Sequence, residues 1–190
     1  MSDSASSTAR PASRFLTVTV ARELGLLLAL SVLFPFLVHL IPVPEDARLG
    51  QRLLPMFYAP LLGALCGRAR MAAIVAVLAP WLNWVLTRHP SPPGAVLMSL
   101  ELLVFVLAVS ALLTRLGARW FLAVPACVAG KAAAVVAAAL FPALIGGRPL
   151  LPWVTTAVVQ GLPGIAILVV LTVLVLRFYP PGSSGQGPAA

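Results

Sequence analysis

Long apolar runs separated by short polar gaps make up most of the sequence from residue 20 onward. The gaps hold arginine, proline and glycine, and no run alternates polar and apolar positions as a membrane β-strand would. A helix needs about 17–25 apolar residues to cross a bilayer. The pattern therefore predicts six membrane-spanning helices, at residues 20–42, 53–67, 71–87, 94–114, 120–145 and 151–176.

The predicted span at 53–67 differs from the others. It is too short for a simple lipid-facing crossing, and it contains Pro55 and Pro60. Irregular backbone at membrane depth is tolerated where protein surrounds it. We therefore expect this span to be broken or enclosed by the other helices.

The composition agrees with a membrane protein. Of 190 residues, 61% are hydrophobic and 9% are charged, and the mean hydropathy is +1.03. Soluble domains average about 25% charged residues, and a chain of this size has too little interior for so much apolar surface. The net charge of +8 comes from arginines in short gaps, with no basic stripe interleaved with aromatic residues, which argues against nucleic-acid binding. The two cysteines, Cys66 and Cys127, lie in apolar segments and are expected to be small buried hydrophobes.

The arginines also predict the orientation of the chain. One side of the predicted membrane carries Arg10, Arg14, Arg22, Arg68, Arg70, Arg115, Arg119 and Arg177. The other side carries Arg48, Arg52, Arg88 and Arg148. Under the positive-inside rule, eight against four places both termini in the cytoplasm. We expect one transmembrane domain at residues 20–177 between disordered cytoplasmic tails at 1–19 and 178–190.

Two charged residues fall within predicted spans, Glu101 in the fourth and Lys131 in the fifth. A charge at the bilayer centre costs about 2.5–3.5 kcal/mol on insertion scales, so both side chains are expected to face the bundle interior. At 1.5 Å per residue, Glu101 would lie about 10 Å and Lys131 about 16–20 Å from the outer ends of their spans. Two interpretations are open, an ion pair that joins two helices or a contact with a polar ligand.

Other polar and aromatic residues are predicted in the outer half of the membrane. Asn83 and Gln160 either form interhelical hydrogen bonds or contact a ligand. Trp84 and Trp153 are either interface anchors or stacking surfaces, and His39 is expected to cap the outer end of the first span.

The first span carries small residues at a spacing of four, Ala21, Gly25 and Ala29. These positions share one helical face and would form a flat groove that another helix can approach closely. That helix belongs either to this chain or to a partner.

No catalytic set is evident in the sequence. Ser99 and Ser110 have no histidine at their predicted depth, because His39 and His89 lie at the outer edge, and no hydrolase, metalloprotease or phosphate-loop motif occurs. We therefore expect no enzyme activity, no metal and no cofactor. A small intramembrane enzyme and a purely structural subunit of a membrane complex stay open as alternatives.

Four stretches resemble a known family. They are "LLPMFYAPLLGALCG", "LAPWLNWVLTRHPSPPGAVLMSLEL", the "AGK" of the fifth span and "GLPGIAI" of the sixth. With six spans around them, the chain resembles the membrane-embedded S components of energy-coupling factor (ECF) vitamin transporters, which are subunits of bacterial ABC importers.

The resemblance implies a fold, a function and partners. S components are six-helix bundles of the bacterial cytoplasmic membrane with both termini inside, and they capture a vitamin or similar micronutrient from outside. They dock on a transmembrane T subunit that carries two ATPases, and they do not hydrolyse ATP themselves. Carried over, the docking face falls on Ala21, Gly25 and Ala29. The solute pocket would be lined by Asn83, Glu101, Lys131 and Gln160, with Trp84 and Trp153 beside it, under a lid at "VPEDARLGQR".

Overall fold

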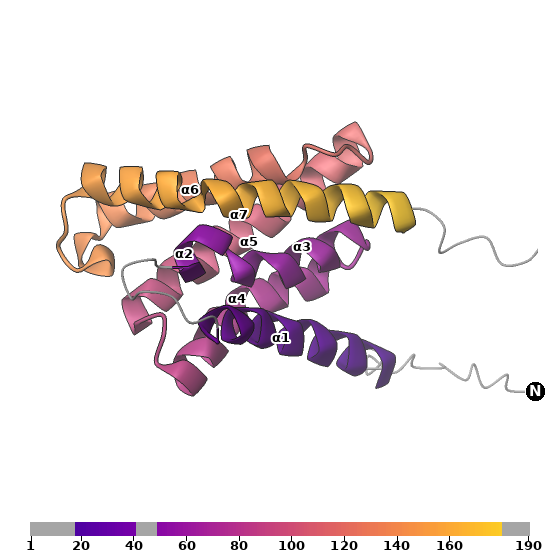
Figure 1. Ribbon diagram of the computed structural model, residues 1–190, viewed down its shortest axis with the longest axis horizontal. Coiled ribbons are helices and arrows are strands. Elements are labelled where there is room, and N and C mark those ends of the chain that lie inside the picture. Colours follow the sequence, from indigo (N-terminus) through magenta and orange to yellow (C-terminus); the bar gives the residue numbers. More distant parts are fainter. Residues whose placement is uncertain (1–17, 41–48, 180–190) are drawn as a thin grey trace, which may run out of the picture.

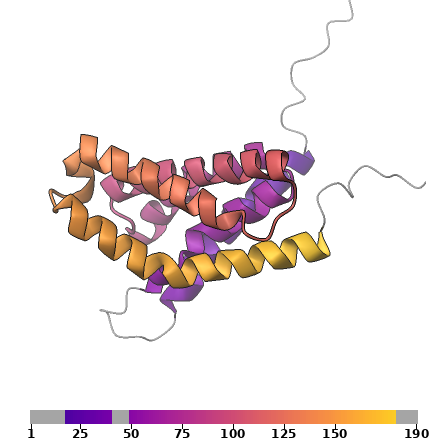
Figure 2. The ribbon, with the colours of Figure 1, turned by 90° about the horizontal axis from the view of Figure 1, so that it is seen from above.

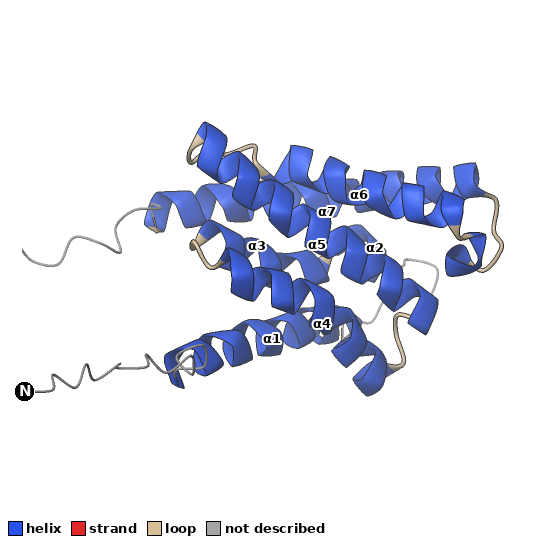
Figure 3. Cartoon of the chain, turned by 180° about the vertical axis from the view of Figure 1, so that it is seen from behind, coloured by secondary structure: helices blue, strands red, loops and turns tan. Residues whose placement is uncertain are grey.

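The computed structural model describes residues 18–40 and 49–179, and within these ranges helices are joined by short turns with no strand (Figure 3). Five helices are long and apolar enough to cross a membrane. They are α1 (Val18–His39), α4 (Ala69–Thr87), α5 (Pro92–Leu116), α6 (Ala123–Leu140) and α7 (Leu150–Phe178). The all-helical prediction is confirmed, and the chain has the make-up of a multi-pass membrane protein.

The second predicted span is broken, as expected, but its predicted start at residue 53 is wrong, because the element begins four residues earlier. It consists of α2 (Leu49–Leu53), a 3₁₀ turn η2 (Pro55–Phe57) and α3 (Tyr58–Leu65). The break lies at Leu54, whose backbone is left-handed with φ 51° and ψ 46°. Such a conformation is costly for a residue with a side chain, so the surrounding packing must hold it. The Tyr58 hydroxyl donates a hydrogen bond to the Leu53 carbonyl, one of the acceptors that the break leaves free at the end of α2.

The short helix α3 lies at the centre of the bundle. Six of its eight residues are buried, and it contacts α1, α4, α5 and α7. Its enclosure explains how so short and irregular a segment is accommodated, because its backbone groups meet protein instead of lipid.

The long helices surround α3 in chain order. α1 packs beside α4, α4 beside α5, α5 beside α6 and α6 beside α7, while α2 lies along α7 (Figures 1 and 2). The first turn of α1 and the last turn of α7 lie at the same end of the bundle in both views.

The fifth predicted span is shorter than expected at both ends. The fifth span was expected to run from 120 to 145, but α6 ends at Leu140 and a separate 3₁₀ turn, η3 (Pro142–Ile145), follows. Proline lacks the amide hydrogen needed to continue a helix, so Pro142 begins a new element. The other three long spans from 71 onward begin and end within two residues of prediction.

Parts of the predicted tails and lid lie outside the described residues. α1 begins at Val18 and α7 reaches Phe178, so both helices extend slightly into the ranges expected to be tails, 1–19 and 178–190. Residues 1–17 and 180–190 of these tails and residues 43–48 of the predicted lid are outside the described ranges, and the last four residues of the lid, 49–52, are helical in α2.

Candidate functional site: an ion pair between two membrane helices

The structure joins Glu101 of α5 to Lys131 of α6. The Lys131 ammonium nitrogen lies 2.6 Å from Oε1 of Glu101, and their side chains are 25% and 10% exposed. A hydrogen-bonded pair of this kind lowers the cost of placing two charges in a medium of low dielectric constant. Because a quarter of the Lys131 side-chain surface is exposed, the pair is not fully enclosed by the bundle.

Gly130 allows the two helices to come this close. A Cβ atom placed on Gly130 would lie 2.6 Å from the Glu101 carbonyl oxygen and 3.4 Å from the Phe105 Cβ. No side chain fits there, so only glycine permits α6 to rest on the α5 backbone. The next residue along α6 is Lys131, which explains why its side chain reaches Glu101.

The two charges lie at one depth. Glu101 is nine residues after Pro92, where α5 begins, and Lys131 is nine residues before Leu140, where α6 ends. At 1.5 Å per residue, each lies about 14 Å from the end of its helix. The deeper position expected for Lys131 is wrong because it assumed a fifth span that extended to 145.

Other elements pack close to the ion pair. Cys127 lies one turn before Lys131 and is buried, as expected. Phe105, one turn after Glu101, packs edge-on against Phe57 of η2, with ring centroids 5.1 Å apart. The irregular segment of the second span therefore reaches the level just below the ion pair.

Asn83 does not join the pair. Its Nδ2 donates to the Ala79 carbonyl within α4 and to the Ser31 carbonyl of α1, at 3.0 and 3.3 Å. Ser99 Oγ donates to the Val77 carbonyl at 2.9 Å, which fixes α4 against α5 near the level of Glu101. Asn83 lies six residues beyond Val77, about 9 Å further toward the end of α4.

Among the described residues, no hydrogen bond or ion pair joins the remaining predicted site residues to Glu101 or Lys131. The Arg88 guanidinium lies 5.7 Å from the centre of the Trp84 ring, so Trp84 already has a cationic neighbour. Trp153 packs against a small apolar cluster of Leu97, Ala138 and Ile145. Gln160 is half-buried, and its Oε1 is a buried acceptor without a partner among the described residues. The side chain of His39 lies outside the described residues.

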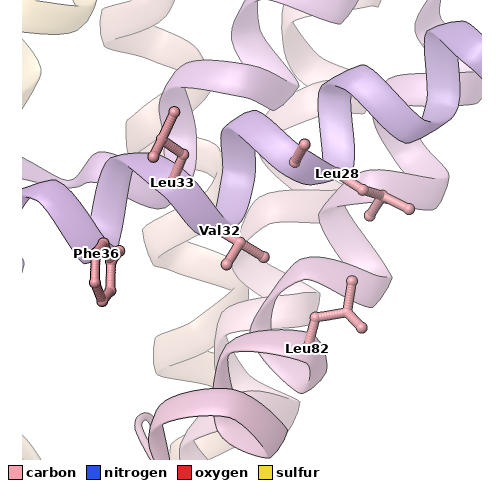
Figure 4. A pocket seen from close by; sticks show the side chains of 6 residues that line it. Leu28, Val32, Leu33, Phe36 and Leu82 are labelled. Carbon is pink, nitrogen blue, oxygen red and sulfur yellow. The ribbon is translucent and has the colours of Figure 1, made fainter.

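The small-residue face of α1 is open. Ala21, Gly25 and Ala29 are all exposed, and a Cβ on Gly25 would meet nothing within 4 Å in the described part of the chain. Ala29 borders an apolar groove of about 540 Å³ between α1 and α4. Figure 4 shows Leu82 of α4 facing Leu28 and Val32 of α1 across it.

The structure also forms a groove that the sequence did not predict. Its volume is about 200 Å³, and it lies at the Leu150 end of α7, beside α2. It is lined by Gln51, Arg148, Pro149, Pro152, Trp153 and Thr156. Of these, only Trp153 was predicted as a site residue, because the contact between α2 and α7 joins segments about 100 positions apart and leaves no local pattern.

The chain has no match among models of known protein families, curated proteins or solved structures.

Proposed function

We propose that this chain is the solute-binding S component of an ECF-type importer in a bacterial cytoplasmic membrane. It captures a vitamin or related small polar micronutrient from outside the cell and delivers it through a T subunit and two ATPases. The proposal rests on the resemblance of four sequence stretches to that family and on the site described above.

The Glu101–Lys131 ion pair carries the proposal. Ionisable residues within membrane helices are rare and commonly mark a solute or ion pathway. Here two helices bring opposite charges together at equal depth, and Lys131 stays 25% exposed. A polar solute that offers an acceptor to Lys131 and a donor to Glu101 replaces the contact between them without leaving either charge unpaired.

The exposed face of α1 supports a membrane partner. Ala21, Gly25 and Ala29 present backbone with little side chain, and all three are exposed in the described part of this chain. Small faces of this kind allow close helix approach in lipid. The apolar groove that begins at Ala29 extends the same face and would accept the larger side chains of the T subunit.

Six crossings and cytoplasmic termini complete the proposed topology. The sixth crossing is the broken element from α2 to α3, residues 49–65. Its apolar part, Pro55–Leu65, is shorter than the roughly 17 residues of a lipid-facing crossing, and the surrounding helices enclose it. With an even number of crossings both termini lie on one side, in agreement with the shared end of α1 and α7.

A structural subunit of a membrane complex is the second candidate. It is supported by the 2.6 Å contact between Glu101 and Lys131 and by the hydrogen bonds of Asn83 to backbone carbonyls, which leave both sets of groups satisfied without a ligand. The serine residues considered for an enzyme are engaged as well, because Ser99 and Ser110 donate to the carbonyls of Val77 and Val106.

Native mass spectrometry of the detergent-purified chain tests the proposal. We expect a small molecule to be retained by the wild type and lost from the neutral double variant Glu101→Gln/Lys131→Met, which leaves no unpaired charge in the membrane. The variant Asn83→Leu, which removes an interhelical hydrogen bond away from the pair, serves as the control and should keep the molecule. Equal retention by the wild type and the neutral double variant would contradict the proposed site.

A further inference from the structure

The groove between α2 and α7 is lined on part of its surface by the polar residues Arg148, Thr156 and Gln51. It lies at the start of α7, where the first amide hydrogens of a 29-residue helix have no side-chain cap. Beside them lies Arg148, and no acidic residue is among the described residues that line the groove. Pro149 and Pro152, the residues of the helix start that line the groove, carry no amide hydrogen, so the positive potential that favours an anion comes mainly from the Arg148 guanidinium.

Arg148 is held in place by its own turn. Gly146 and Gly147 have positive φ values of 65° and 69°, which bring the chain back onto η3. The Arg148 amide and its Nε then both donate to the Ile145 carbonyl, at 3.4 and 2.9 Å. The two terminal guanidinium nitrogens form no hydrogen bond within the described residues, so the fork that suits a carboxylate is free and oriented.

Thr156 is also free to bind. Its neighbour Thr155 donates its hydroxyl to the carbonyls of Leu151 and Pro152 in the helix itself. The hydroxyl of Thr156, which lines the groove, makes no such bond to the described residues. Gln51 of α2 lines the opposite side and adds an amide that both donates and accepts.

The rest of the groove is flat and apolar. Trp153 contributes an indole fixed by packing against Ile145 and Leu97, and the rings of Pro149 and Pro152 lie beside it. At about 200 Å³ the groove is smaller than the roughly 300–1,000 Å³ pockets of drug-sized ligands, so its ligand is small. A lipid phosphate would need only Arg148, and it would leave the indole, the proline rings and Gln51 unused.

We propose that this groove binds a small aromatic or heteroaromatic carboxylate, with the carboxylate on Arg148, the polar ring edge toward Thr156 and Gln51, and the ring against Trp153. The inference does not depend on Glu101 or Lys131. It adds a second, shallower site at the end of the bundle that the proposed function assigns to the outside.

Fluorine NMR of the full chain in phosphatidylcholine nanodiscs tests this site, with 4-fluorobenzoate as the probe and 4-fluorobenzamide as its neutral counterpart. We expect saturable line broadening of the benzoate and much weaker broadening of the benzamide. Arg148→Gln should weaken benzoate binding about tenfold or more, because a charged hydrogen bond is lost. Arg88→Gln, which alters another arginine beside a tryptophan, should leave it unchanged.

A second pair of variants tests the hydroxyl. Thr156→Val should weaken benzoate binding by roughly threefold to tenfold, the effect of one neutral hydrogen bond, and Thr155→Val should have no effect. Equal binding of benzoate and benzamide, or full binding by folded Arg148→Gln, overturns the proposal. So does Arg148-dependent quenching of indole fluorescence by brominated phosphatidylglycerol without benzoate binding, which would assign the groove to a lipid head group.

The result is independent of the importer proposal. Glu101→Gln/Lys131→Met should bind 4-fluorobenzoate as the wild type does, because the groove has no residue in common with the ion pair. Loss of benzoate binding in this folded variant would contradict a separate site.

Discussion

Single side chains decide how α5 meets α6. Gly130 has no Cβ atom, so α6 can approach the backbone of α5 closely. The side chain of the adjacent Lys131 then lies 2.6 Å from the Glu101 carboxylate. A charge inside a membrane is tolerated only with a partner or a polar cavity. The close approach at Gly130 and the ion pair are therefore one structural unit.

Replacement of Gly130 by alanine tests this dependence. The added Cβ would lie 2.6 Å from a backbone carbonyl oxygen, which cannot move away as a flexible side chain can. We expect Gly130→Ala to lower the stability of the protein in detergent by about 1–3 kcal/mol, the usual cost of overpacking. Thermal unfolding measures the effect.

Gly25→Ala is the matched control, since a Cβ there meets nothing within 4 Å of the described residues. Its unfolding temperature should equal or exceed that of the wild type, because alanine favours the helix. Equal unfolding temperatures for Gly130→Ala and Gly25→Ala would show that the close approach at Gly130 is not required.

At the residue scale, the sequence indicated that Glu101 and Lys131 face the bundle interior but left their pairing open. The free energy needed to place a charged side chain in lipid depends on residue type, so a hydropathy pattern is enough to identify such residues. The estimated depth of Lys131 relative to Glu101 depends on where α6 ends. Pro142 places that end five residues before the predicted boundary. The sequence pattern could not decide whether Asn83 and Gln160 bond to other helices or to a ligand. A buried side-chain amide can donate a hydrogen bond to either partner.

Among the helical elements, the broken second span is the most unusual. Its break at Leu54 is held against α7, where Gly164 leaves room for the backbone of α2. A Cβ on Gly164 would lie 2.7 Å from Leu54 Cγ, 2.8 Å from the Leu53 carbonyl carbon and 2.9 Å from the Arg52 carbonyl oxygen. The two proline residues and the short length predicted the irregularity, but not its partner on α7.

Two neighbouring glycines of α7 give a matched test of this contact. Gly164→Ala should displace the α2–η2 junction and destabilise the protein by about 1–3 kcal/mol. Gly161→Ala should be neutral or stabilising by up to about 1 kcal/mol, because its Cβ would lie at an ordinary distance of 3.7 Å from Leu54 Cδ1 and because alanine favours the helix. Thermal unfolding of both variants decides. Equal destabilisation by the two variants would mean that the contact at Gly164 does not hold the break at Leu54 in place.

A large side chain on the small-residue face of α1 tests whether this face docks on a partner. Gly25→Leu fills the small-residue face, so we expect it to block association with the T subunit while solute binding and unfolding temperature stay at wild-type values. Ala132→Leu places the same side chain on an exposed position of α6 and should leave association intact. Co-purification from a membrane that contains the T subunit is the measurement, and full recovery with Gly25→Leu would remove α1 from the docking surface.

Over the whole molecule, the arginines predict that both termini are cytoplasmic, and the first turn of α1 and the last turn of α7 lie at one end of the bundle (Figure 1). Hydropathy fixed the five long helices well because each must match the thickness of a bilayer. It could not show that α3 lies at the centre, since burial by protein and burial by lipid select the same apolar residues.

The orientation is testable with Cys66. It was expected to be buried, and that expectation is wrong, because Cys66 follows the last residue of α3 and is exposed there. In a Cys127→Ser background, a membrane-impermeant maleimide should label Cys66 in inside-out vesicles and not in intact cells. With both cysteines replaced by serine, Ser91→Cys in the turn between α4 and α5 should show the opposite pattern. Labelling of both positions from the same side would contradict the six-crossing arrangement.

The most direct test of the account is exchange of the two charges, Glu101→Lys/Lys131→Glu, followed by mass spectrometry of the small molecule that the purified protein retains. The exchange keeps an ion pair between α5 and α6, and thermal unfolding near the wild-type temperature will show that it has formed. We predict that the exchanged protein folds and retains none of the solute, because the acceptor and donor positions are reversed. A folded, exchanged protein that retains the wild-type amount would contradict recognition by this pair and leave it a purely structural contact.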